Sequence, residues 1–245
     1  MKMKRLLILG AGSDIAKAIA RRFAAQGTDL YLAHRNPDAI SDFAKDVEIR
    51  NGVDAVPLKF DALDFRSHQK FYESLSEKPD GVICVFGYLG DNSAAFSDFS
   101  ETERILDTNY KGAVSILNIA AEDFKNRKNG FIAGISSVAG DRGRGSNLFY
   151  GSAKAGFTAY LSGLRNALYG TGVHVLTVKP GFVNTSMTEG MDLPGMLASE
   201  PDDVAKDIFR AWKKKKDVVY TSRLWKYIML IIIHIPEFIF KRLSL

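Results

Sequence analysis

The chain of 245 residues is 46% hydrophobic and 25% charged, which excludes a disordered chain, a collagen-like repeat and a multi-pass membrane protein. Its single cysteine, Cys84, cannot form an internal disulfide, as is typical of a protein in a reducing compartment. Residues 213–245 hold eight bases and two acids, whereas the rest of the chain holds 25 bases and 26 acids. Nucleic-acid-binding proteins usually carry a basic face on their folded body, so we expect no nucleic-acid partner.

Short apolar segments alternate with amphipathic segments, which is the pattern of βαβ units. We predict strands over 5–9, 29–33, 55–59, 81–86, 130–135, 173–179 and 218–220. We predict helices near 13–26, 38–51, 64–76, 101–126, 148–169 and 201–215. The predicted fold is α/β: a doubly wound, seven-stranded parallel sheet of the Rossmann type with helices on both faces. Ligands of such sheets bind where the strands end, at their carboxyl edge.

A glycine turn follows the first predicted strand and leads into a helix. Such a turn offers free backbone N–H groups and the positive end of the helix dipole to a pyrophosphate. Glycine also ends strands for conformational reasons alone, so the turn by itself leaves both interpretations open. The candidate cofactor contacts are Gly10, Gly12, Ser13, Asp14 and Ile15.

The second predicted strand is followed by Arg35 rather than by an acid. An acid there accepts hydrogen bonds from the ribose 2′-hydroxyl of NAD, whereas an arginine pairs with the 2′-phosphate of NADP. An exposed loop arginine without a ligand is the alternative. Asp61, just after the third strand, is either an adenine contact or a simple loop acid. We predict NADPH in preference to NADH, and no metal.

Tyr150 and Lys154 are four residues apart in a predicted helix, so they share a face. A free tyrosine has a pKa of about 10 and donates its proton poorly at neutral pH. A nearby ammonium favours the phenolate, so we expect Lys154 to lower the pKa of Tyr150 and make it a better acid. Ser137 lies 13 residues before Tyr150 at a strand end, where its hydroxyl can hold a substrate carbonyl. An isolated Tyr/Lys pair is usually a solvated helix face, so the prediction depends on the combination.

This combination resembles the short-chain dehydrogenase/reductase family over about residues 5–220. The family pattern has a glycine-rich first turn, an Asn-x-x-Gly in the fourth helix, and a Ser followed 13 residues later by Tyr-x-x-x-Lys. It ends with Pro-Gly-x-Val-x-Thr after the sixth strand, which is residues 180–185 here. Four motifs in the family's order make the resemblance specific.

The resemblance implies an NAD(P)H-dependent reductase that passes hydride to a keto group. It implies that Tyr150 is the general acid/base, that Lys154 tunes it and binds the nicotinamide ribose, and that Ser137 orients the carbonyl. Asn109 would hold a water in the proton relay. Further cofactor contacts are implied at Gly87, Pro180, Gly181, Val183 and Thr185.

The chain departs from the family pattern in two segments. Asp14 and Ala16 replace the second and third glycines of the first turn, and Asp14 brings a negative charge near the pyrophosphate. The fourth strand reads Cys-Val-Phe-Gly over 84–87 instead of Asn-Asn-Ala-Gly. Both departures indicate a divergent subgroup.

The tail after the last predicted strand, residues 221–245, is apolar, aromatic and basic. We predict two short helices in it, over 223–234 and 236–243. The apolar run over 227–233 is far shorter than the roughly 20 residues that span a bilayer. We therefore divide the chain into a Rossmann-type catalytic body, 1–220, and a helical tail of the same domain, 221–245.

Aromatic residues flanked by Lys and Arg are typical of a helix that lies on a membrane surface. In the tail they are Trp225, Tyr227, Phe238 and Phe240. We expect a cytoplasmic protein that is peripheral at the cytoplasmic face of the membrane. Packing of the apolar tail in a homo-oligomer interface is the alternative.

Arg142 and Arg144 stand in a glycine-rich loop between Ser137 and Tyr150, where they can pair with a substrate phosphate. An exposed basic loop without a ligand is the alternative. The loops and the tail together resemble the decaprenylphosphoryl-2-keto-ribose reductase subgroup. That resemblance implies a polyprenyl-phosphate-linked keto-sugar as substrate, in envelope polysaccharide synthesis.

Two other functions stay open at this point. One is a soluble short-chain dehydrogenase that acts on a small alcohol or ketone. The other is a catalytically inactive nucleotide-sensing protein, against which the complete Ser, Tyr, Lys and Asn set argues.

Overall fold

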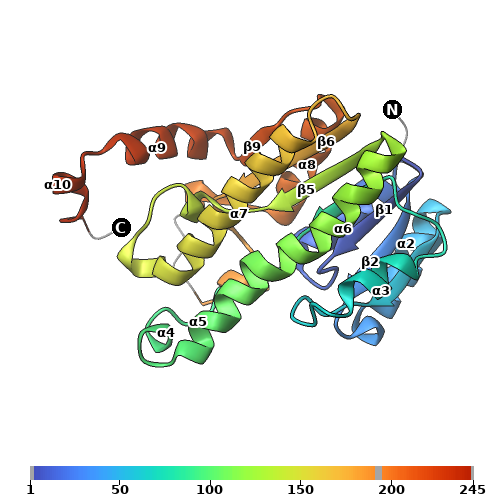
Figure 1. Cartoon of the computed structure of the whole chain (residues 1–245), viewed down its shortest axis with the longest axis horizontal. Helices are drawn as coiled ribbons and strands as arrows, with labels where there is room; N and C mark the ends of the chain where they lie inside the picture. The colour runs from blue at the N-terminus through green and yellow to red at the C-terminus, as the bar shows by residue number, and fades with distance from the viewer. Residues whose placement is uncertain (1–2, 191–194, 244–245) are drawn as a thin grey trace.

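The computed structural model describes residues 3–190 and 195–243 (Figure 1). Its centre is a seven-stranded parallel sheet with the strand order β3-β2-β1-β4-β5-β6-β9. The strands are β1 (Arg5–Leu9), β2 (Asp29–His34), β3 (Ala55–Lys59), β4 (Gly81–Cys84), β5 (Gly130–Ile135), β6 (Val173–Pro180) and β9 (Val218–Thr221). Two short strands, β7 (Phe182–Val183) and β8 (Ala198–Ser199), form a separate parallel pair. The predicted doubly wound α/β fold is confirmed.

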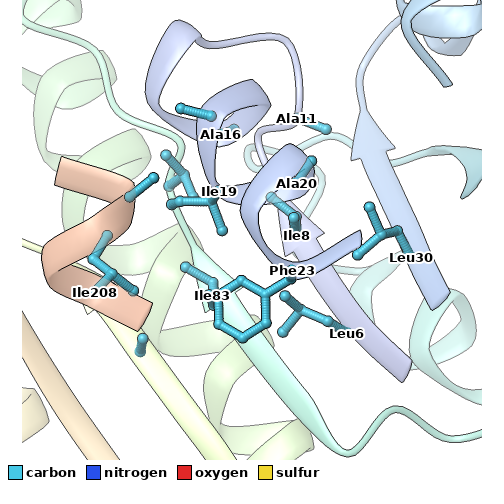
Figure 2. Close-up of a cluster of buried hydrophobic side chains, with 14 of the residues drawn as sticks. Leu6, Ile8, Ala11, Ala16, Ile19, Ala20, Phe23, Leu30, Ile83 and Ile208 are labelled. Carbon is cyan, nitrogen blue, oxygen red and sulfur yellow. The ribbon is translucent and has the colours of Figure 1, made fainter. Parts of the chain in front are cut away.

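Helices cover both faces of the sheet because the strand side chains alternate between two cores. Leu6 and Ile8 of β1 belong to the core beneath α1 (Asp14–Ala24), α2 (Ser41–Asn51) and α8 (Pro201–Lys213). Figure 2 shows Leu6 and Ile8 beside Phe23 of α1. Leu7 and Leu9 belong to the opposite core, beneath α3 (His68–Glu73), α6 (Gly112–Arg127) and α7 (Leu148–Ala167). Every second residue of the strand therefore packs against the same layer.

The helix predicted over 101–126 is divided in the structure. It consists of α5 (Phe99–Leu106), a π-helical segment (Asp107–Lys111) and α6, and the short α4 (Ala94–Ser97) precedes it. Segments of this kind widen a helix locally and are frequent at functional sites. Here the segment carries Asn109, which is buried. The helix predicted over 64–76 is also shorter, because only His68–Glu73 is helical.

The tail forms α9 (Arg223–His234), as predicted, and a second helix, α10 (Glu237–Phe240), that is shorter than predicted. Figure 1 shows both helices, in red, extending from β9 along the end of the molecule where the loop before α7 lies. Trp225 and Met229 of α9 are buried in a small third core together with Val138. Residues 244–245 of the predicted tail lie outside the described residues. No helix within 3–190 and 195–243 is long and apolar enough to cross a membrane.

Candidate active site

A cavity of about 1080 Å³ lies at the carboxyl edge of the sheet. Its wall combines the start of α1, the loop after β4, the segment after β5, the first turns of α7, the segment after β6 and one residue of α9. The predicted site residues that line it are Ser13, Asp14, Ile15, Gly87, Ser137, Arg144, Tyr150, Lys154, Pro180, Gly181, Val183 and Thr185. Parallel strands with right-handed crossovers bring these distant segments to one edge.

Ser137 and Tyr150 both line the cavity wall, and the Ser137 hydroxyl acts to lower the pKa of the Tyr150 phenol. Ser137 follows β5 and its Oγ accepts a hydrogen bond from the backbone of Ala139 (3.1 Å), which holds the hydroxyl in place. Ser136 binds β5 to α7, because its Oγ donates to the carbonyl oxygen of Lys154 (3.0 Å). Gly140 lies against the same turn of α7, where a Cβ would come within 2.6 Å of the Lys154 backbone. The predicted pairing of serine and tyrosine therefore depends on close contact between β5 and α7.

Lys154 is almost fully buried beside Tyr150. Its Nζ donates a hydrogen bond to the carbonyl oxygen of Ile135 (3.0 Å) and lies 5.5 Å from the centre of the Tyr150 ring. Burial lowers the pKa of Lys154 to about 8, because the charged form loses its hydration.

The expected direction of the Tyr150 pKa shift is wrong for this structure. Burial is the larger effect and raises the pKa of Tyr150 to about 12, while the hydrogen bond with Ser137 acts in the lowering direction. The ammonium of Lys154 is directed to the Ile135 carbonyl, so it does not dominate the pKa of the phenol. Tyr150 is thus a protonated donor over the whole neutral range.

Asn109 is buried behind the cavity and holds the loop after β4. Its Nδ2 donates to the carbonyl oxygens of Tyr88 (2.6 Å) and Ile105 (2.9 Å), and its Oδ1 accepts from the backbone nitrogen of Tyr88 (3.2 Å). Gly87 lies directly against it, because a Cβ there would be 3.0 Å from Oδ1. The geometry gives Asn109 a role in positioning this loop, and its part in a proton relay stays a prediction.

The first turn is closely packed around its two glycines. Gly10 has a φ of +87°, and a Cβ there would lie 2.6 Å from the backbone of Phe86. A Cβ at Gly12 would lie 2.6 Å from Nε2 of His34. Both glycines shape the turn without lining the cavity, whereas Ser13 caps α1 through a hydrogen bond from the Ala16 nitrogen (3.2 Å). A backbone cradle at a helix N-terminus fits the pyrophosphate of a dinucleotide.

The carboxylate of Asp14, at the start of α1, is hydrogen-bonded to Ser186 on another segment of the cavity wall. It accepts hydrogen bonds from the backbone nitrogen and the hydroxyl of Ser186, in the segment after β7. Asp14 replaces a glycine of the family pattern, and its negative charge is partly stabilised by these two hydrogen bonds from Ser186.

Arg35 and Asp61 lie outside the lining of the cavity. Arg35 is exposed after β2, and Asp61 is exposed after β3, where its Oδ1 accepts from the Leu63 nitrogen (2.9 Å). Their cofactor roles stay predictions.

The sequence analysis did not identify His34 as a residue of the first turn. Its ring lies against Gly12, and its Nδ1 is hydrogen-bonded to the carbonyl oxygen of Asn36 (2.6 Å).

Trp225 of the tail is buried and lines the cavity, which corrects its expected position at a membrane surface. Its indole contacts Gly181 so closely that a Cβ at that glycine would collide with the ring. Its Nε1 donates a hydrogen bond to the carbonyl oxygen of Leu197 (3.0 Å). The tail therefore closes part of the cavity, a contact for which the sequence carries no local signal.

The two arginines predicted for the substrate have different environments. Arg142 is directed to the tail, where it forms an ion pair with Glu237, donates to the carbonyl oxygen of Ile233 (3.1 Å) and stacks on Phe240. It does not line the cavity, which corrects the prediction for this residue. Arg144 does line it, and burial lowers its pKa. Within the described part of the chain, no group of three or more His, Cys, Asp or Glu is placed to hold a metal ion.

The site can hold a carbonyl oxygen between two hydroxyl groups and transfer a proton to it. Ser137 and Tyr150 both line the cavity, and the buried Lys154 ammonium lies beside the Tyr150 ring. Such an arrangement suits general acid catalysis in a reduction.

Comparison with known proteins agrees with this geometry. A family model described as short chain dehydrogenase matches residues 4–193. The chain is 36% identical over 241 residues to an "uncharacterized oxidoreductase" of Mycobacterium tuberculosis, which covers 97% of this chain and 96% of that protein. It is 34% identical over 243 residues to an "uncharacterized oxidoreductase" of Streptomyces coelicolor, covering 98% and 96% of the two chains.

Among solved structures, a short-chain dehydrogenase from Sphingobium yanoikuyae in complex with NADPH superposes with a TM-score of 0.83. The match covers 96% of this chain and 97% of that one at 22% identity, so it shows the shared fold. The family model and the two oxidoreductases carry the assignment further, because they match most of the chain. The chain belongs to the short-chain dehydrogenase family of NAD(P)-dependent oxidoreductases.

Proposed function

We propose that this protein is an NADPH-dependent reductase of a carbonyl compound, with Ser137, Tyr150 and Lys154 as its catalytic residues. The observation that carries the proposal is that Ser137, Tyr150 and Lys154 line one cavity, with the buried Lys154 ammonium 5.5 Å from the centre of the Tyr150 ring. The NADPH complex of the related Sphingobium yanoikuyae dehydrogenase supports the choice of cofactor class.

Tyr150, Ser137 and Lys154 have different roles in the proposed reaction. The hydride for the carbonyl carbon would come from a bound reduced nicotinamide. The Tyr150 hydroxyl donates the proton to the carbonyl oxygen, and the Ser137 hydroxyl donates a hydrogen bond that holds this oxygen in place. The result would be an alcohol: the C=O π bond, a C–H bond of the reduced nicotinamide and the Tyr150 O–H bond break, and one C–H and one O–H bond form. The Tyr150 phenolate then regains its proton from solvent. Lys154 holds the ribose beside Tyr150 through its ammonium.

Arg35 supports NADPH over NADH. It stands at the carboxyl end of β2 with its guanidinium in solvent, free to pair with a 2′-phosphate. Replacing Arg35 with alanine should raise the KM for NADPH by roughly 10-fold and leave the KM for NADH unchanged, since a charge-assisted hydrogen bond contributes about 1.5–3 kcal/mol. An unchanged preference in steady-state assays with both cofactors would exclude this role.

A lipid-linked keto-sugar is the substrate class that we propose. The cavity joins apolar residues, among them Leu89, Ile105 and Phe182, to the guanidinium of Arg144. A wall of this kind suits an amphiphile with a phosphate, such as a polyprenyl-phosphate-linked keto-pentose of envelope polysaccharide synthesis. The test is NADPH oxidation with a farnesyl-phosphate-linked keto-pentose, the free keto-pentose and cyclohexanone. Comparable kcat/KM for cyclohexanone would instead favour a dehydrogenase of small ketones.

The tail supports a position at the cytoplasmic face of the membrane. Helices α9 and α10 expose several large apolar side chains to solvent: Leu224, Tyr227, Leu230, Ile231, Phe238 and Ile239. Exposed bases flank them at Lys226 and Lys241, which favours an anionic lipid surface. Flotation with vesicles of phosphatidylglycerol should recover the full chain but not a chain that ends at Thr221. Equal recovery of the two chains would exclude a membrane role of the tail.

A homo-oligomer is the second partner that we propose, and a different surface supports it. Phe96 of α4 and Phe99 of α5 are 68% and 69% exposed, which is unusual for large apolar side chains. Light scattering after size-exclusion chromatography should give a multiple of the chain mass, and the variant F96S/F99S should lower it. A monomer mass for the unaltered chain would rule out the oligomer.

A further inference from the structure

Three residues that line the cavity each carry a buried polar atom without a hydrogen-bond partner. Five buried side-chain nitrogen or oxygen atoms in the described residues lack a hydrogen bond, and three of them belong to residues that line this cavity. They are Oδ1 of Asn92, Nε of Arg144 and Oδ1 of Asn147. A buried polar atom without a partner costs free energy, so three of them at one mouth indicate a ligand that completes their hydrogen bonds.

The three residues come from two segments that are fixed to each other. Asn92 lies in the loop before α4, whereas Arg144 and Asn147 lie in the loop before α7. Nδ2 of Asn92 donates a hydrogen bond to the carbonyl oxygen of Gly145 (3.0 Å). This bond joins the two segments and leaves Oδ1 of Asn92 as a buried acceptor without a partner.

Asp91, next to Asn92, also lines the cavity, but its carboxylate already accepts hydrogen bonds from the Ser93 and Ala94 backbone nitrogens, so the charge available to a ligand is that of Arg144. No ion pair within 3–190 and 195–243 includes Arg144. The carboxylate of Asp141 acts to raise the pKa of Arg144, but it already forms an ion pair with Lys179 and accepts a hydrogen bond from Tyr220. Directly after Asn147, the 20-residue helix α7 begins, and Asn147 does not cap it. The positive end of a long helix dipole therefore adds to the charge of Arg144.

We infer that Asn92, Arg144 and Asn147 form a subsite for the phosphorylated, hydroxyl-bearing ring of a sugar. Nε of Arg144 donates to a phosphate oxygen, and the two amide oxygens accept hydrogen bonds from ring hydroxyls. The subsite lies in the same cavity as Tyr150. It rests on the proposed function and extends it, because it assigns the substrate's sugar phosphate to particular residues. A neutral ketone would leave the guanidinium unpaired, so the subsite discriminates against small alcohols and ketones.

The subsite can be tested by calorimetric titration, which does not depend on turnover. The full chain, saturated with NADP⁺ and also without it, is titrated with ribose 1-phosphate, with ribose and with inorganic phosphate. We expect ribose 1-phosphate to bind at least 10-fold more tightly than either of the others. The variant R144Q should lose about 10- to 100-fold in affinity for ribose 1-phosphate, the range expected for one charge-assisted hydrogen bond.

Arg142→Gln is the matched control, because it removes the same charge from the same loop while its guanidinium contacts the tail. Equal losses for R142Q and R144Q, or no loss for R144Q, would overturn the subsite, as would phosphate binding as tightly as ribose 1-phosphate. If R144Q fails to fold by circular dichroism, R144K replaces it and should still lose affinity, since lysine has no Nε–H at that depth. Binding through Arg144 without reduction of the keto-pentosyl phosphate would retain the subsite and refute only the proposed reaction.

Discussion

The carboxylate of Asp14 accepts a 3.0 Å hydrogen bond from the backbone nitrogen of Ser186, which lies 172 residues later in the chain. The Ser186 hydroxyl adds a second, longer hydrogen bond of 3.3 Å to the same oxygen. Asp14 opens α1 beside the cofactor cradle, and Ser186 follows the segment that lines the cavity after β6. A side chain at a glycine position of the family pattern thus holds two walls of the active site together.

Asp14→Asn should bind NADPH about 2- to 5-fold more tightly at low salt. The substitution removes a negative charge from the start of α1, where charges typically contribute 0.3–1 kcal/mol, and keeps an oxygen that accepts from Ser186. Fluorescence titration with NADPH measures the effect, which should shrink in 0.5 M salt. Asp42→Asn, in the first turn of α2, is the matched control and should change nothing. Weaker NADPH binding by D14N would contradict the argument.

Tyr150→Phe should lower kcat by at least about 100-fold, because general acid catalysis typically contributes that much or more. NADPH binding should be unchanged, since the ring and the position of Lys154 remain. The control is Tyr160→Phe in the same helix, whose hydroxyl donates to Asn118 (2.7 Å) outside the cavity. Single-turnover NADPH oxidation distinguishes the two variants. Turnover by Y150F at the unaltered rate would remove Tyr150 as the acid.

Lys154→Met should stabilise the protein at pH 7 by about 1–3 kcal/mol, at the cost of activity. Burial lowers the pKa of Lys154 to about 8 in the folded chain, whereas the unfolded chain has the ordinary value of 10.5. Below pH 8 both states are protonated, and the folded state carries the full cost of the buried charge. Between pH 8 and 10.5 the unfolded state binds more protons, so the stability of the unaltered protein rises with pH.

Urea unfolding at pH 7 and at pH 9.5 measures this difference. The advantage of K154M should be largest at pH 7 and smaller at pH 9.5. The exposed Lys125, replaced by methionine, is the control and should show no such trend. A K154M advantage that stays constant with pH would contradict a buried, charged Lys154.

Trp225→Phe should loosen the cavity wall without removing its apolar ring. The substitution deletes the hydrogen bond from Nε1 to the carbonyl oxygen of Leu197, which typically contributes about 1 kcal/mol. We expect a higher KM for the carbonyl substrate, a small change in kcat, and faster proteolytic cleavage near residues 195–199. Trp212→Phe, in the core beneath α8, should lower the melting temperature without this cleavage. Equal cleavage of both variants would mean that the bond is unimportant for the wall.

The elements and the residues of the candidate site could be predicted because their signals are local. The alternation of Leu6 and Leu7 between two cores follows from the period of a strand, and it appears directly in the sequence. The spacing of Tyr150 and Lys154 places both on one helix face whatever surrounds them. The helix α9 was predicted with its observed ends for the same reason, since its apolar run and its flanks are contiguous.

The pKa of Tyr150 could not be predicted in this way. The sequence shows the charge of Lys154 near Tyr150. The burial of the Tyr150 hydroxyl, however, depends on all the atoms that surround it, and these atoms come from segments far apart in the chain. The same holds for Arg142 and Arg144, two residues apart in one loop. Only the folded chain brings Glu237 to the first, while the second is left at the cavity.

The sequence by itself determined the fold class and the family, and it supplied the candidate catalytic residues, because each depends on periodicity or on fixed spacing along the chain. The tertiary structure alone decided the partner of Asp14, the entry of Trp225 into the cavity wall and the direction of the Tyr150 pKa shift. Each of these depends on which distant segments meet at the carboxyl edge of the sheet. Burial and hydrogen bonding act between neighbours in space, and the residues that become neighbours are set only when the chain has folded.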